Sequence, residues 1–159
     1  MLILLDIDGV LVPANSWRKP ELMDDGFPAF NLRSVKALQR ILSETNASVL
    51  LTTSHKTQYN VSQWTDLLSS RGINPVKIER LTTNSLQTSR VDEILEWYAK
   101  EYIPNEAFVI IDDDKMLNGL PENIKHNLVL TSPSVGLTDE LADKAIAILQ
   151  KTHINTIKV

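Results

Sequence analysis

The sequence predicts an α/β layered domain with a mostly parallel central sheet, and two features indicate it. Short runs that are almost entirely apolar alternate with segments whose apolar residues recur at helical spacing. A strand that is apolar at nearly every position is typical of a parallel sheet with helices on both faces. The chain has 159 residues, near the commonest domain size, so we expect a single domain over 1–159.

The predicted elements begin at the start of the chain. Residues 2–5 are wholly apolar and predict a first strand. Apolar residues at helical spacing predict a helix over 31–43, and an apolar run predicts the next strand over 47–53. A second helix is expected over 61–70, where Gly72 is a suitable C-terminal stop.

The same alternation continues to the end of the chain. Ser89 is a candidate N-cap for a helix that ends before Pro104. Thr138 is a candidate N-cap for a helix over 139–150, which has an acidic first turn, as the helix dipole favours. The remaining predicted strands are 76–81, 107–111, 128–131 and, at the edge of the sheet, 154–159.

The composition excludes several classes of protein. Cysteine is absent, which rules out disulfide scaffolds, thiolate zinc sites and cysteine nucleophiles. Hydrophobic residues make up 43% and charged residues 23%, as in an ordinary folded domain, and the net charge of −4 does not suggest a general nucleic-acid coat. The chain lacks a membrane-length apolar run and a basic leader, so we expect a soluble cytoplasmic protein that needs no membrane and no obligate protein partner.

Polar residues follow three of the predicted strands at the point where each strand ends. Asp6 and Asp8 follow the first strand, hydroxyl residues end the second at 52–54, and three aspartates occupy 112–114. Ligands of open α/β sheets bind at the carboxyl ends of the strands. We therefore expect these residues to meet at one edge of the sheet, although an Asp triplet could also be a plain polar strand exit, with Asp114 beginning the loop.

The repulsion between several carboxylates in one cleft has to be offset by another interaction. Two like charges about 4 Å apart repel by about 4 kcal/mol at an effective dielectric of 20. A bound Mg²⁺ ion would offset this repulsion, and protonation of one acid is the alternative. Asp6 and Asp8 would share a face of an extended segment, so one could attack while the other handles protons. Gly9 permits a tight turn beside them.

The hydroxyl residues after the second strand suit a phosphate group. The Thr52 hydroxyl and the Thr53 backbone N–H could hold phosphate oxygens, and Thr53 or Ser54 could take the role of Thr52 instead. The backbone of Gly9 is a further candidate contact to the substrate. His55 and Lys56 come next and could touch substrate, but a surface position is the simpler interpretation.

These motifs resemble those of the haloacid dehalogenase (HAD) superfamily of phosphohydrolases. Leu-Leu-Asp-Ile-Asp-Gly-Val-Leu at 4–11 is similar to its first motif, Leu-Leu-Thr-Thr-Ser at 50–54 to its second, and Val-Ile-Ile-Asp-Asp-Asp at 109–114 to its fourth. The C-terminal stretch from 128 to 149 resembles the tail of small HAD domains, some of which accompany nucleic-acid repair modules. The resemblance implies a three-layer Rossmann-like fold without a large cap.

The resemblance also implies a role for each residue. Asp6 would be the nucleophile that forms an aspartyl-phosphate, and Asp8 would protonate the leaving group and then activate water. Thr52 would bind the phosphoryl oxygen. Mg²⁺ would be held by Asp6, the backbone carbonyl of Asp8, Asp113 and, directly or through water, Asp112. Such a two-step hydrolysis is covalent carboxylate catalysis.

The third motif of that superfamily is a basic residue, usually Lys, near a helix start. Arg90 stands at that place here, and Lys115 and Lys77 are rival candidates for the cation that binds phosphate. Arg keeps the charge but is not equivalent to Lys, so this substitution also permits a catalytically idle Mg²⁺-binding module.

Three prolines break any helix over 12–30, so we predict an irregular loop there. We expect this loop to lie near the active site. Its aromatic and basic residues could stack a base and meet phosphate, or Phe27 and Phe30 could simply tuck under the loop. The members of this set are Trp17, Arg18, Lys19, Phe27 and Phe30.

The chain has no room for a large inserted cap, and capless members of the superfamily resemble enzymes that act on macromolecules. We therefore expect a Mg²⁺-dependent phosphatase for a protruding phosphomonoester, such as the phosphate end of a nucleotide or polynucleotide. A phospho-accepting receiver domain for signalling shares the acids and the metal, but a receiver carries its acceptor Asp on a middle strand, where this chain has hydroxyl residues.

Overall fold

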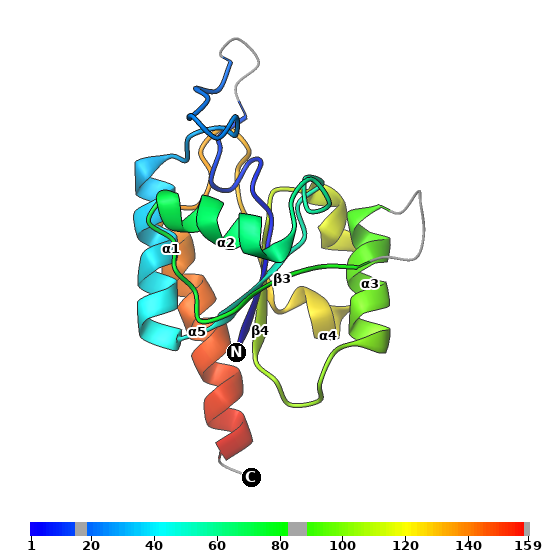
Figure 1. The fold of residues 1–159 in the computed structure, drawn as a ribbon. Helices are drawn as coiled ribbons and strands as arrows, with labels where there is room; N and C mark the ends of the chain where they lie inside the picture. Colours follow the sequence, from blue (N-terminus) through cyan, green and yellow to red (C-terminus); the bar gives the residue numbers. More distant parts are fainter. Residues whose placement is uncertain (15–18, 83–88, 158–159) are drawn as a thin grey trace.

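The computed structural model describes residues 1–14, 19–82 and 89–157 (Figure 1). Its sheet has five parallel strands in the order β3-β2-β1-β4-β5. The strands are β1 (Leu2–Leu5), β2 (Ser48–Leu51), β3 (Ile78–Arg80), β4 (Phe108–Asp112) and β5 (Leu128–Leu130). The helices are α1 (Leu32–Thr45), α2 (Val61–Ser70), α3 (Arg90–Lys100), the 3-10 helix η1 (Lys115–Gly119), α4 (Glu122–Lys125) and α5 (Asp139–Ile157).

Helices cover both faces of this sheet, as its apolar strands require. Ile3 and Leu5 of β1 belong to a core shared with α1, α2 and α5, whereas Leu4 points to a second core shared with α3, η1 and α4. Figure 1 shows α1 and α5 on one side of the sheet and α3 and α4 on the other. The predicted three-layer α/β fold with a parallel sheet is therefore confirmed.

The strand order reverses between β1 and β4, and this switch brings the polar strand ends together. The ladder continues one residue past the strands: Asp6 donates its N–H to the Ile111 carbonyl at 3.0 Å, and the N–H of Thr52 donates to the Leu5 carbonyl at 2.9 Å. Since Leu5 is also in register with Ile111, Asp6 lies level with Asp112 on one side and Thr52 on the other. Ligands of such sheets bind at this point.

Two helix starts match the sequence prediction. Ser89 caps α3 by accepting the N–H of Asp92 at 3.1 Å. Thr138 accepts the N–H of Leu141 at 3.2 Å at the start of α5. None of the helices in the described ranges is long and apolar enough to cross a bilayer.

The predicted edge strand at 154–159 is wrong, because α5 continues to Ile157. Its Ile and Thr residues favour strands, but a helix already nucleated at Asp139 extends through them at a cost of only a few tenths of a kcal/mol per residue. Residues 158–159 lie outside the described part. The sequence also did not predict η1 and α4, which are too short to show a helical period.

Part of the loop over 12–30 is anchored on Arg71, at the C-terminal end of α2. The Arg71 guanidinium makes two contacts to the Asp25 carboxylate, at 2.6 and 2.9 Å, and donates to the carbonyls of Phe27 and Pro28. Phe27 is buried and packs edge-on against Phe30. Phe27 is therefore buried, as the simpler interpretation expected, but it belongs to the main core, and Phe30 packs half-buried against that core. Trp17 and Arg18 lie outside the described residues.

Candidate active site

Three carboxylates from two strand ends form one cluster. Asp6, Asp112 and Asp113 each place an oxygen within 4.8 Å of the others. Asp6 follows β1 and is 5% exposed, Asp112 ends β4 and is fully buried, and Asp113 is half-buried. The structure thus brings together acids that lie more than 100 positions apart, as the strand-end argument predicted.

Arg90 is the first residue of α3, in the helical layer that packs on the sheet, and its side chain reaches the acid cluster. Its Nη1 donates to Asp112 Oδ2 and lies 3.6 Å from Asp6 Oδ1. Burial opposes the Arg90 charge, but the Asp112 and Asp6 carboxylates outweigh it and raise the pKa of the guanidinium. Arg90 is therefore a fixed positive charge against the two most buried acids.

The positive charge of Arg90 does not neutralise the three carboxylates of the cluster. Burial, reinforced by the Asp112 carboxylate, raises the pKa of Asp6 to about 8, and Arg90 offsets only part of that rise. Burial also raises the pKa of Asp112 despite its contact with Arg90. Three ionised carboxylates and one guanidinium would leave a net charge of −2, so the site favours either a proton or a divalent cation.

Gly9 allows Asp113 to approach the cluster. A Cβ atom on Gly9 would stand 2.0 Å from Asp113 Oδ2, and the residue has a φ of +78°. The Gly9 carbonyl accepts the Thr131 hydroxyl at 2.7 Å, which ties the turn to the residue after β5. A glycine is therefore required here both for its backbone angle and for the space beside it.

Two buried donors at this edge have no hydrogen-bond partner among the described residues. They are the Thr52 hydroxyl oxygen, on a fully buried residue, and the Nε atom of Arg90. Buried polar atoms usually have a hydrogen-bond partner in folded proteins, so both donors are available to a ligand. The oxygens of a phosphate group could accept from both. Thr53 is also buried, and its hydroxyl accepts the N–H of His55 at 3.3 Å.

Asp8 does not join the acid cluster. The chain turns after Asp6, where the Ile7 carbonyl accepts the N–H groups of Val10, Leu11 and Val12, so the segment is not extended as the sequence suggested. The Asp8 side chain is 51% exposed, and its Oδ2 lies 2.7 Å from His55 Nε2. Its proposed role as a metal ligand through the backbone carbonyl stays a prediction.

His55 and Lys56 have specific contacts that sequence reasoning did not foresee. His55 joins Asp8 and packs edge-on against Phe27 at 5.4 Å between ring centroids. The ammonium of Lys56 lies 2.8 Å from Glu93 of α3, and both side chains are mostly buried. The only signal in the sequence was their position directly after the second motif.

Of the three candidate cations for phosphate binding, Arg90 contacts the acid cluster. Lys77 precedes β3 at the amino edge of the sheet, where it pairs with Glu79 at 2.9 Å, so it is not at the acid cluster. Lys115 is exposed at the start of η1. Asp114 accepts the N–H of Met116 at 2.9 Å and caps η1, as expected for a residue that begins the loop.

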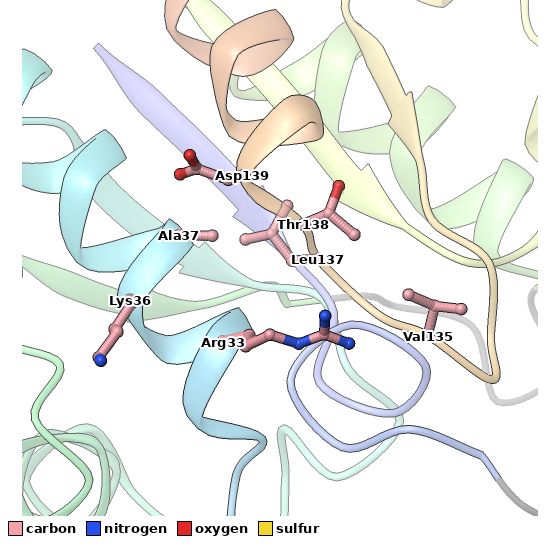
Figure 2. Close-up of a pocket in the computed structure, with 7 residues that line it drawn as sticks. All are labelled: Arg33, Lys36, Ala37, Val135, Leu137, Thr138 and Asp139. Carbon is pink, nitrogen blue, oxygen red and sulfur yellow. The ribbon is translucent and has the colours of Figure 1, made fainter.

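A pocket of about 370 Å³ lies elsewhere, between the amino ends of α1 and α5 (Figure 2). Its polar residues include Arg33 and Lys36 of α1, and Arg33 extends toward Val135. The Asp139 carboxylate at its rim accepts a hydrogen bond from Arg40 Nε at 3.0 Å. None of the predicted site residues lines this pocket, so it is separate from the acid cluster.

The acid cluster fits a hard divalent cation. Carboxylate oxygens are the ligands that Mg²⁺ prefers, and the excess of negative charge matches a charge of +2. Asp6, Asp112 and Asp113 would hold the ion. When bound, it would neutralise the carboxylates and polarise a phosphoryl oxygen.

Comparison with known families agrees with this geometry. A family model described as the HAD domain in Swiss Army Knife RNA repair proteins matches residues 2–142. The chain belongs to this family. The resemblance of its motifs to the HAD superfamily and to repair-associated HAD domains is thereby confirmed. No curated protein matches the sequence at a significant level. In this HAD domain, the matched residues include every member of the acid cluster and Arg90.

Proposed function

We propose that this HAD domain is a Mg²⁺-dependent phosphatase that removes a terminal phosphate from RNA or another polynucleotide through an aspartyl-phosphate on Asp6. The observation that carries the proposal is the buried Asp6 carboxylate beside Asp112 and Asp113, with the unpaired donors of Arg90 and Thr52 at the same edge. The membership in a family of RNA repair HAD domains supports a polynucleotide substrate.

The residues of the site divide the reaction into two steps. An oxygen of Asp6 attacks phosphorus while the bond to the leaving oxygen breaks, and protonated Asp8 gives that oxygen its proton. Asp8, now ionised, takes a proton from water, which attacks the aspartyl-phosphate and releases phosphate and Asp6. Arg90 and Thr52 would hold the phosphoryl oxygens throughout. Exposure of Asp8 gives it access to both the leaving group and water.

The size of the loops supports an exposed phosphate end as the substrate. Only residues 9–31 separate Asp8 from α1, which is too few for a cap domain over the site. A macromolecular end can itself cover such a site and exclude water.

A phosphate-release assay tests the proposal. A panel of terminally phosphorylated oligonucleotides and small phosphomonoesters is incubated with wild type, Asp6→Asn and, as a matched control, Asp66→Asn on the exposed face of α2. Asp6→Asn should lower kcat by at least about 10³-fold, as expected for loss of a nucleophile, and the control should stay within about 2-fold.

The other outcomes have distinct meanings. No phosphate release from any substrate by wild type with Mg²⁺ would overturn the proposal. A stable phosphorylated protein that turns over slowly would favour a receiver domain. Tight binding of Mg²⁺ without turnover would favour an idle metal-binding module.

A further inference from the structure

Arg80, the last residue of β3, carries a charge that forms no ion pair within the described residues. Its Nη1 donates to the carbonyls of Tyr59 at 2.6 Å and Lys56 at 3.4 Å. All 20 Asp and Glu residues of the chain lie within the described ranges, and none of their side chains forms an ion pair with Arg80. The adjacent Glu79 is paired with Lys77.

The two carbonyls fix the direction of this guanidinium. Arg80 is half-buried, so part of its hydration is lost, and a cation in that state is stabilised by an anion. It lines a pocket of about 180 Å³ between the ends of β2 and β3, together with Lys56, Thr57, Leu81 and Thr82. Among these residues the Lys56 charge is used by Glu93, and the Thr82 hydroxyl lies 3.4 Å from a Glu101 oxygen. Arg80 is thus the unpaired charge of this pocket.

The pocket opens at the same edge of the sheet as the acid cluster. Leu5 is in register with Leu51, and Leu51 with Arg80, so Arg80 stands two strands from the end of β1. Neighbouring strands are about 4.8 Å apart, so the backbone of Arg80 lies roughly 10 Å from the backbone at the end of β1. A short stretch of nucleic-acid backbone can bridge this separation.

We propose that Arg80 forms a second phosphate subsite that binds an internucleotide phosphate next to the terminal phosphate held at Asp6. This inference rests on the proposed function and adds the specificity residue. It makes the domain prefer an oligonucleotide end to a small phosphomonoester, because only the oligonucleotide carries a flanking phosphate. Arg80 binds substrate and takes no part in the chemical step.

Steady-state kinetics on two substrates test the subsite. The measured quantity is the ratio of kcat/KM for a terminally phosphorylated octanucleotide to kcat/KM for p-nitrophenyl phosphate. Arg80→Gln should lower this ratio roughly ten- to a hundred-fold, the effect of one hydrogen bond to a charged group. Lys77→Gln removes one positive charge at the opposite end of β3 and should leave the ratio unchanged. The salt dependence of octanucleotide KM should fall by about 0.7 in log–log slope with Arg80→Gln alone.

An anchoring role for Arg80 predicts different results. Equal losses on both substrates would overturn the subsite and leave Arg80 as a support for the loop at 56–59. The absence of any loss on either substrate would also overturn it. Should Arg80→Gln fail to fold, Arg80→Lys keeps the charge and loses the planar guanidinium, whose Nη1 donates to both carbonyls. A ratio within about 3-fold of wild type in that variant supports the charge role, and a ratio reduced as far as expected for Arg80→Gln contradicts it.

Binding separates failure of the subsite from failure of the proposed function. Fluorescence anisotropy of the labelled octanucleotide is measured with Asp6→Asn, with and without Arg80→Gln, and no turnover is needed. Weaker binding on loss of Arg80 supports the subsite even if wild type hydrolyses nothing. Equal binding contradicts it, whatever the phosphatase assay shows.

Discussion

Replacing Asp6 by Asn should stabilise the metal-free protein, and the gain should grow as pH rises. Asp6 has a pKa of about 8 in the folded protein, against an ordinary value of 3.8, because it is buried and faces Asp112. Between these two pH values the folded state holds a proton that the unfolded state has released. The free energy of unfolding therefore falls as pH rises through this window and levels off above the folded pKa.

The structure sets the size of this effect. One extra proton on the folded state gives a slope of at most about 1.4 kcal/mol per pH unit. Between pH 5 and pH 8 the wild-type protein should lose up to about 4 kcal/mol from this one group. Asn has no proton to release, so the Asp6→Asn variant should lack this loss and be the more stable protein at pH 8.

Urea unfolding in EDTA at several pH values between 5 and 8 measures the difference. Asp8→Asn is the matched control, because Asp8 is half exposed and lies outside the acid cluster, so its curve should follow wild type. Added Mg²⁺ should stabilise wild type at pH 8 more than Asp6→Asn, since binding requires the ionised carboxylate. Parallel curves for wild type and Asp6→Asn across the whole range would refute the reasoning.

Three further changes test other parts of the site. Gly9→Ala places a methyl group against Asp113 at a positive φ, and it should cost about 1–3 kcal/mol of stability and weaken Mg²⁺ binding; unchanged affinity by calorimetry would contradict the steric argument. Arg90→Gln leaves buried carboxylates unpaired and should destabilise the metal-free protein at pH 8 by about 3 kcal/mol, and a loss below about 1 kcal/mol would show that the pairing is weak. His55→Ala frees the Asp8 side chain and should lower kcat on alkyl phosphates about 10-fold more than on aryl phosphates, because alkyl leaving groups depend most on proton donation; equal losses would exclude a role in orienting Asp8.

Much of the fold was predictable because its strands are buried on both faces. The runs that became β1 and β4 are apolar at nearly every position, and burial of both faces follows from that pattern alone. The C-terminal end of α5 was not predictable in this way. Residues 154–157 are rich in β-branched side chains, yet they extend a helix that was already formed, and local preference is too weak to end it.

Some residues of the site were likewise predictable from the sequence, and others were not. Asp6 and Asp113 were recognisable because each follows an apolar run that ends at one edge of the sheet. The partners from other layers were harder to foresee. Glu93 reaches Lys56 from α3, and His55 meets Asp8, only because packing brings these elements together.

The sequence by itself determined the apolar runs that form the five strands and the acids that lie at their carboxyl ends. These properties depend on the order of apolar and polar residues along the chain. Only the tertiary structure decided that Asp6 is buried, which raises its pKa, and that Asp8 faces solvent and His55. Burial and charge proximity depend on which layers pack over a residue, and its neighbours in sequence do not specify that.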